Sequence, residues 1–205
     1  GRQPTPLHER LPPDDGTGQT TNWLREAVSK IQLPEGTYFQ QLIVGASWGR
    51  ALLHDISRAR EEIAVAVFVM SSREITDALC AAAARGVQVT VLVDREQHLH
   101  PREPRVKDLM TQINRDCERA GVTLAYTQPQ DGLMHCKLVV IDAKLAWIGS
   151  ANLSVAAMRK NDELVMRLWG SRSKIKTLRD LFMKLWALAK LRLAVCMAAL
   201  DFPEA

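Results

Sequence analysis

The chain has 205 residues, 47% of them hydrophobic, and carries a net charge of +4 at pH 7. This length allows one compact domain with a sizeable core, and no run reaches the roughly 20 apolar residues of a membrane-spanning helix. The four cysteines lie apart, without a Cys-x-x-Cys pair or metal-ligand spacing to histidine, so we expect no disulfide framework and no structural zinc. The modest basic excess suits a polyanionic partner, although surface lysine and arginine side chains usually serve only for solvation.

The N-terminal residues differ in composition from the rest. Residues 1–20 contain four prolines and three glycines with hardly any large apolar side chain, which is typical of a mobile leader. A short helix is predicted over residues 21–31, so residues 1–36 are assigned to a leader and residues 37–205 to one folded domain. The chain begins at Gly1 rather than at methionine, so we expect that a segment was removed, for which a signal peptide and a membrane anchor are the candidates. The visible part is expected to be soluble, and the sequence leaves its compartment open.

Short apolar runs alternate with amphipathic segments over the folded part. Strands are predicted at 37–44, 62–70, 87–94, 122–127, 135–141, 145–148 and 162–169, and helices at 48–60, 72–86, 106–120, 154–159 and 171–200. The strand, helix and strand between residues 62 and 94 have a short crossover, which implies two parallel strands covered by helices. We therefore predict an α/β fold, with a mixed sheet flanked by helices.

Residues 94–107 form the most charged stretch and are predicted to be a loop leaving the carboxyl end of a strand. Ligands often bind at this place in α/β sheets, so the loop is a candidate for substrate binding, with Arg95 as a contact. An exposed polar connector explains the same composition equally well. His98 and His100 lie in this stretch without further ligands at suitable spacing, and we expect no metal site there.

The C-terminal helix becomes apolar nearly all round after Trp186. Lys190 and Arg192 interrupt this stretch, which is also too short to span a bilayer. Burial in the core or a dimer contact is the favoured explanation, and insertion into a membrane interface is the less favoured one.

Residues 134–163, MHCKLVVIDAKLAWIGSANLSVAAMRKNDE, place polar side chains within two apolar strands joined by a tight turn. The polar residues are His135, Lys137, Ser150, Asn152 and Glu163. Because side chains alternate along a strand, one face is predicted to carry His135, Lys137, Val139 and Ile141, and the other Cys136, Leu138, Val140 and Asp142. An imidazole and an ammonium side by side favour a site that faces a phosphate.

The pattern His135-x-Lys137-x4-Asp142, followed by Gly149-Ser150-x-Asn152, resembles the signature of the phospholipase D superfamily. Glu163 stands where that family places an acid. No other histidine in the chain has a lysine two residues later, so the motif occurs once. The resemblance therefore points to the single-motif branch, the Nuc-type endonucleases and Zucchini-like proteins, in which two chains complete one active site. Zucchini-like proteins carry a zinc finger, and its absence here favours the Nuc-like side.

Phosphodiester hydrolysis without a metal needs a nucleophile, a proton donor and fixed positive charge. The resemblance implies that His135, part of which is neutral at physiological pH, attacks phosphorus and forms a phosphohistidine. His135 of the partner subunit would protonate the leaving group across a two-fold axis. Lys137 and Asn152 would hold the phosphate oxygens, with a hydroxyl from Ser150, and Glu163 would fix the tautomer of a histidine.

The remaining motif residues are given other roles. Asp142 and Gly149 are expected to be structural, while Arg159 and Lys160 are candidates for further phosphate contacts, although solvation explains them as easily. No cofactor and no metal are expected. The favoured function is a metal-independent nuclease, homodimeric, acting on DNA or RNA. The alternatives are a phospholipid hydrolase or transferase of the phospholipase D or cardiolipin type, and a binding module for nucleic acid or membrane surfaces without catalysis.

Overall fold

The computed structural model describes residues 39–45, 47–127, 134–170 and 172–200, and within these ranges the side chains from Gln41 to Leu191. The chain divides into two units, residues 1–35 and 36–205, and every described residue belongs to the second. The predicted leader and its helix over residues 21–31 lie outside the described residues, so both stay predictions.

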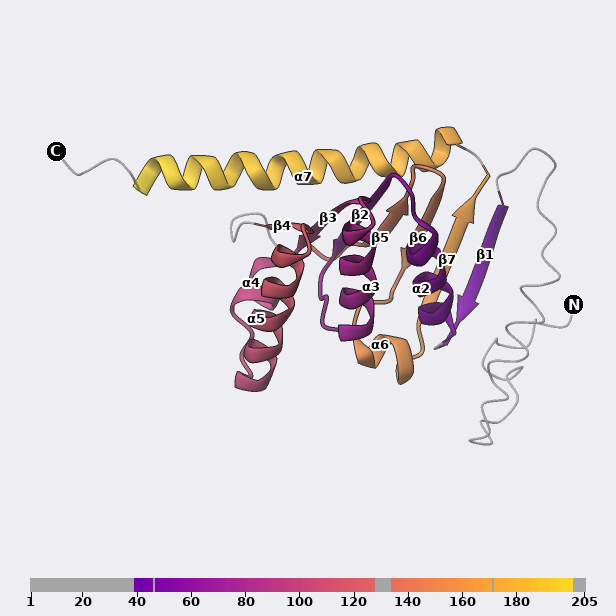
Figure 1. Cartoon of the computed structure of the whole chain (residues 1–205), viewed down its shortest axis with the longest axis horizontal. Helices are drawn as coiled ribbons and strands as arrows, with labels where there is room; N and C mark the ends of the chain where they lie inside the picture. The colour runs from indigo at the N-terminus through magenta and orange to yellow at the C-terminus, as the bar shows by residue number, and fades with distance from the viewer. Residues whose placement is uncertain (1–38, 46, 128–133, 171, 201–205) are drawn as a thin grey trace, which may run out of the picture. The chain divides into compact units, whose positions relative to one another are not determined.

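One seven-stranded mixed sheet organises the described part (Figure 1). Its strands are β1 (Phe39–Val44), β2 (Glu62–Val67), β3 (Gln88–Val93), β4 (Thr123–Tyr126), β5 (Lys137–Ile141), β6 (Leu145–Gly149) and β7 (Leu164–Trp169). The order across the sheet is β1-β7-β6-β5-β2-β3-β4. Strands β2, β3 and β4 are parallel, as predicted for the first two, and the other pairings are antiparallel. The predicted α/β fold with a mixed sheet is confirmed.

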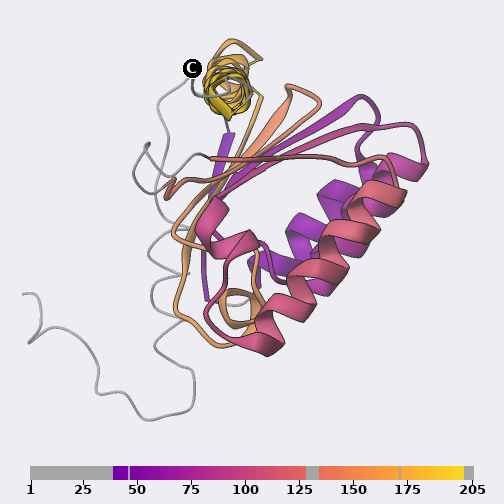
Figure 2. The ribbon, with the colours of Figure 1, turned by 90° about the vertical axis from the view of Figure 1, so that its left-hand side faces the viewer.

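Helices cover both faces of the sheet. They are α2 (Trp48–Arg58), α3 (Arg73–Ala84), α4 (Arg95–Leu99), α5 (Pro104–Arg119), α6 (Val155–Arg159) and α7 (Arg172–Leu200). Figure 2 shows α7 end-on at one side of the sheet and the other helices at the opposite side. Two separate cores result, one under α2, α3, α5 and α6 and the other under α7. The sheet is therefore buried on both faces.

The long helix α7 is attached to the sheet by one apolar face. Ile175, Phe182 and Trp186 are buried in the core beneath it. In the stretch past Trp186, for which burial or a dimer contact was predicted, Ala189 is buried. Leu188 and Leu191 are exposed, and the side chains after Leu191 are not described. None of the described helices combines the length and apolar character that crossing a bilayer requires.

The predicted loop over residues 94–107 is wrong. The structure has α4 there, then a short connection, and α5 already begins at Pro104. Asp94 starts α4 because its carboxylate accepts a hydrogen bond from the Gln97 amide at 3.2 Å. Pro104 suits the first turn of α5, where a backbone N–H is not needed. The many charged residues between 94 and 107 suggested a loop, but the cap at Asp94 starts a helix there.

Strand β2 ends at Val67, three residues before its predicted end. Beyond it, the Phe68 amide donates to the Cys136 carbonyl at 3.1 Å, and Met70 forms an isolated parallel bridge with Leu153. The segment after β2 therefore runs beside both halves of the motif, the residues before β5 and those after β6.

Candidate active site

His135 and Lys137 lie at the start of β5, at the same edge of the sheet as the carboxyl ends of β2 and β3. Along β5, Val139 packs in the core under α2 and α3, whereas Leu138 packs in the core under α7. The predicted alternation along this strand is therefore confirmed. The side chain of His135 is exposed, and its ring lies 4.8 Å from the Phe68 ring, centroid to centroid. An exposed imidazole at this edge of the sheet can be reached by a substrate.

The Lys137 ammonium lies over two groups of the same site. Its Nζ donates to the carbonyl oxygen of His135 at 3.0 Å and lies 5.3 Å from the centroid of the Phe68 ring. Burial lowers the pKa of Lys137 below its usual value, while the Cys136 thiol and the Glu163 carboxylate oppose that shift. The two contacts hold a positive charge next to the backbone of His135.

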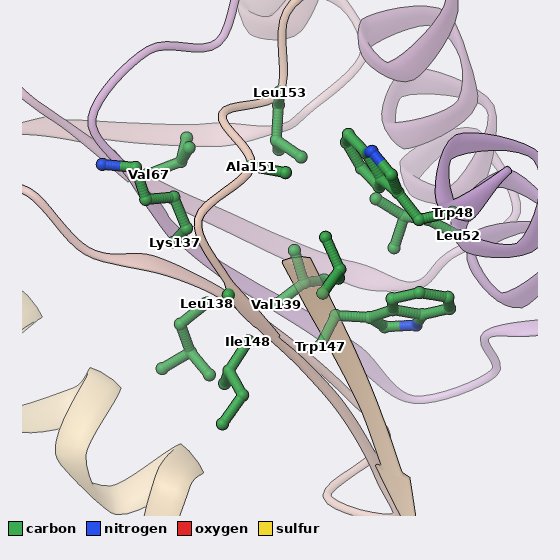
Figure 3. Close-up of a pocket in the computed structure, with 12 residues that line it drawn as sticks. Trp48, Leu52, Val67, Lys137, Leu138, Val139, Trp147, Ile148, Ala151 and Leu153 are labelled. Atoms are coloured by element: carbon green, nitrogen blue, oxygen red, sulfur yellow. The ribbon is translucent and has the colours of Figure 1, made fainter. Parts of the chain in front are cut away.

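A cavity of about 20 Å³ lies beneath the aliphatic stem of Lys137, lined by side chains such as Trp48, Trp147 and Leu153. In Figure 3 the Lys137 ammonium is on the far side of this cavity from both tryptophans. The volume is enough for about one water molecule, so no phosphodiester fits there. The cavity is a packing space under the site, and Lys137 forms part of its lining.

Glu163 is buried, with 8% of its surface exposed, and its two carboxylate oxygens have different donors. The Ser150 hydroxyl donates to Oε2, and Asn161 Nδ2 donates to Oε1 at 3.0 Å. The Leu164 amide in turn donates to the Ser150 hydroxyl at 3.1 Å. Ser150 therefore points to Glu163, and Asn161, which the sequence did not single out, helps to hold the carboxylate.

Asn152 follows β6, one residue before Leu153, whose amide donates to the Val69 carbonyl at 3.0 Å. This bond places Asn152 beside the segment that carries Phe68. Within the described ranges, its Oδ1 is a buried side-chain atom without a hydrogen-bond partner. Leaving a buried polar atom without a hydrogen-bond partner costs about 1–3 kcal/mol. The cost is the same if the amide oxygen and nitrogen exchange places, because a buried amide nitrogen also needs a partner. Oδ1 therefore still requires a hydrogen-bond donor from outside the described residues.

Asp142 lies away from these residues, in the turn between β5 and β6. Its carboxylate accepts hydrogen bonds from the backbone amides of Arg60, Glu61 and Glu62 at 2.8–3.2 Å. Asp142 and Ala143 both have positive φ, 52° and 48°, as a tight two-residue turn requires. This geometry supports the structural role predicted for Asp142.

Replacing Asp142 by Ala is expected to destabilise the fold by about 2–3 kcal/mol, because three amides lose a charged acceptor. Urea unfolding measures this loss. Asp142→Asn should lose less, because asparagine keeps one acceptor oxygen and tolerates positive φ. The folded fraction should keep its activity, and a large loss of kcat at full folding would contradict the structural role.

Gly149, the last residue of β6, faces the backbone of β7 closely. A Cβ at this position would lie 2.8 Å from the Val165 Cα and still closer to the Leu164 carbonyl oxygen. These are backbone atoms, so they cannot move aside. The close approach supports a packing role for this glycine and brings Ser150 next to β7.

The family described as "Cardiolipin synthase, PLD-like domain" matches residues 52–186, which include Lys137, Asn152 and Glu163. The chain belongs to the phospholipase D superfamily. The predicted membership of this superfamily is therefore confirmed.

Relatives in this superfamily match part of the chain. Cardiolipin synthase A of Serratia proteamaculans is 30% identical over 57% of this chain and 23% of its own length. Phospholipase D of Rickettsia bellii is 34% identical over 54% of this chain and 50% of its own length. The chain thus spans half or less of each of these two relatives. The solved structure of Nuc, a phospholipase D family member from Salmonella typhimurium, superimposes with a TM-score of 0.64 at 21% identity, covering 73% of this chain and 96% of Nuc.

The predicted substrate contacts of this phospholipase D-like domain do not all gather at the site. Arg159 forms an exposed ion pair with Glu74 at 3.4 Å, and Lys160 is exposed beside it. Arg95 is the first residue of α4, and its amide donates to the Thr127 hydroxyl at 3.3 Å. None of these three has a described contact with His135. Their role in binding stays a prediction.

Besides Asn161, two residues near the site were not singled out from the sequence. Phe68 touches His135 and Lys137, as described above. Asp94 is buried, caps α4 with one oxygen, and accepts the Met134 amide with the other at 3.4 Å, one residue before His135. In the sequence, Asp94 was marked only by its position as an acidic residue at the end of a predicted strand. Among the described residues, no group of His, Cys, Asp and Glu is arranged to bind a metal.

Proposed function

We propose that this phospholipase D-like domain is a metal-independent phosphodiesterase that cleaves DNA or RNA through a phosphohistidine at His135. The observation that carries the proposal is the exposed His135 imidazole with the Lys137 ammonium held beside it. The Asn152 side chain follows β6 beside the segment that carries Phe68, and its Nδ2 group would be a second donor for the phosphate oxygens. A fixed ammonium and an amide can stabilise charge on those oxygens without a metal ion.

The reaction proceeds in two displacements. A neutral ring nitrogen of His135 attacks phosphorus, the bond from phosphorus to the leaving oxygen breaks, and that oxygen takes a proton from an acid. Water then attacks phosphorus, the phosphorus–nitrogen bond breaks, and the acid regains its proton from the water. The Lys137 ammonium stays protonated throughout and stabilises the charge in both transition states.

The proposed mechanism needs a second histidine as this acid. Because the chain has one motif, a second motif histidine must come from another chain. We assign the role to His135 of the partner subunit in a symmetric homodimer, where each residue can meet its own copy. The exposure of His135 supports this assignment, because a partner must reach the imidazole. Glu163 lies near Lys137, but both its oxygens already have donors within the chain. Its contact with a histidine ring therefore depends on the assembled dimer.

Two features favour a nucleic acid substrate. The superposition covers 96% of Nuc, and the chain carries one copy of the motif, as in the Nuc-type endonucleases that it resembles. Phospholipid hydrolysis or transfer is the second candidate. It is supported by the names of the relatives, cardiolipin synthase A and phospholipase D, at 30% and 34% identity. The exposed leucines of α7, Leu181, Leu188 and Leu191, could lie on a lipid surface.

An assay in excess EDTA tests the proposal. The chain is incubated with labelled single-stranded and duplex oligonucleotides, with bis(4-nitrophenyl) phosphate, and with vesicles of phosphatidylcholine and cardiolipin. We expect cleavage of the oligonucleotides and of the small diester at the same rate with and without chelator. Loss of activity in EDTA would contradict the mechanism. Turnover of the lipids without cleavage of oligonucleotides would favour the second candidate.

A further inference from the structure

We propose that a groove between α4 and α5 binds the nucleoside next to the scissile phosphodiester. This assignment rests on the proposed function, since it names where the nucleic acid substrate lies beyond its phosphate. The groove has a volume of about 670 Å³. Its lining includes Val69, Ser71, His100, Arg102, Val106 and Met110. A volume of this size accommodates a drug-sized ligand, and a nucleoside falls within that range.

The groove lies at the edge of the sheet that carries His135. Strand β5 is antiparallel to β2, so its beginning and the carboxyl end of β2 meet at one edge. Phe68, directly after β2, contacts the His135 ring, and Ser71 lines the groove. Three residues of extended chain span at most about 10 Å. A substrate whose phosphate lies at His135 can therefore place its next sugar and base in the groove.

The lining combines apolar and polar side chains. Val69, Val106 and Met110 give apolar contacts suited to the face of a base, while Glu96 and Arg102 offer an acceptor and a donor. A base and a ribose use both kinds of contact, because each carries hydrogen-bonding groups around a flat or compact body. An acyl chain carries no hydrogen-bonding groups for these charged side chains. The mixed lining therefore favours a nucleoside over a lipid tail.

One wall of the groove is held in place by buried polar contacts. His98 of α4 is buried, and its Nε2 lies 2.6 Å from Asn114 Oδ1 of α5. Burial lowers the pKa of His98, so the neutral ring is favoured in this bond. Asp94 fixes the start of α4 and also binds the Met134 amide beside the catalytic strand. The groove and the phosphate site are thus built on one connected frame, and the groove is preformed.

Affinity for a fluorescein-labelled single-stranded oligonucleotide, measured by fluorescence polarisation with the full His135→Ala chain, tests the groove without cleavage. Val106→Trp places an indole in the groove and is expected to raise the dissociation constant about tenfold. Gln112→Trp puts the same side chain on an exposed part of α5 and should leave the affinity unchanged. Arg102→Ala, at an exposed position, provides a second variant that does not disturb the core. It is expected to weaken binding about threefold or more.

Unchanged affinity in both groove variants would overturn the proposal, as would a failure of the His135→Ala chain to bind the oligonucleotide. Vesicles of phosphatidylglycerol form a second arm. If the groove variants weaken vesicle binding but not oligonucleotide binding, the groove holds a lipid and the nucleoside assignment is wrong. Turnover of bis(4-nitrophenyl) phosphate by the unsubstituted chain is measured in parallel. Its absence counts against the proposed function, whereas normal turnover with unchanged oligonucleotide affinity counts against the groove alone.

Discussion

Replacing His135 by Ala is expected to lower kcat for phosphodiester hydrolysis on the order of 10⁴- to 10⁶-fold, because the proposed covalent intermediate forms on its imidazole. The side chain is exposed and its described contact is with the Phe68 ring, so stability should change by less than about 1 kcal/mol. Initial rates with bis(4-nitrophenyl) phosphate, together with thermal unfolding, check both parts.

A matched control separates loss of the nucleophile from loss of any histidine. His54 is an exposed histidine of α2, on the part of the chain that carries no motif residue. His54→Ala should keep kcat within about twofold, as surface substitutions usually do. If His135→Ala retained most of its activity while folded, the site would need another nucleophile and the mechanism would be wrong.

Replacing Lys137 by Met is expected to lower kcat/KM about 10²- to 10³-fold, because the positive charge next to the phosphate oxygens is lost. Methionine keeps the length and apolar stem that cover the cavity above Trp48 and Trp147, so the fold should persist. Lys144→Met is the control, since Lys144 lies in the turn after β5 and forms an ion pair with Glu61 at 2.7 Å, away from His135. A similar loss in both variants would point to a general charge effect.

The pH profile adds a second measurement for Lys137. Its ammonium must be protonated to hold the phosphate, so activity falls as pH rises through its pKa. Burial lowers that pKa, and the alkaline limb of kcat/KM should therefore lie below the ordinary lysine value of 10.5. The residual activity of Lys137→Met should lack this limb. If the limb persisted there, another group would be responsible for it.

The sequence predicted the parts that depend on short spacings. The two-residue period of β5 placed Val139 and Leu138 on opposite faces, and the structure packs them in separate cores. The same period placed Asp142 away from His135, and its carboxylate indeed binds amides at the start of β2. Such predictions work because side-chain direction along one strand is set locally.

What the sequence did not predict depends on contacts between distant segments. Asp94 reaches Met134 across 40 positions, and Phe68 reaches His135 because β2 pairs with β5. The direction of the Ser150 hydroxyl is another case, since it depends on the register that places Gly149 opposite Val165. No spacing within one strand contains that information.

The helix α4 shows a different limit. Five residues are too few for a helix that persists by propensity alone, and charged residues around it resemble a polar connector. Its stability comes from the Asp94 cap and from His98, which is buried against Asn114. Both are tertiary features, and the groove exists because of them.

The claim on which the account depends is that phosphorus becomes bonded to a ring nitrogen of His135. Reaction with bis(4-nitrophenyl) phosphate, stopped in base because phosphohistidine is acid-labile, is followed by mass spectrometry of the tryptic peptide that spans residues 120–137. We predict a mass increase equal to one 4-nitrophenyl phosphoryl group, located on His135 and absent from His135→Ala. An adduct on another residue, or none at all during a burst of nitrophenol release, would contradict the mechanism.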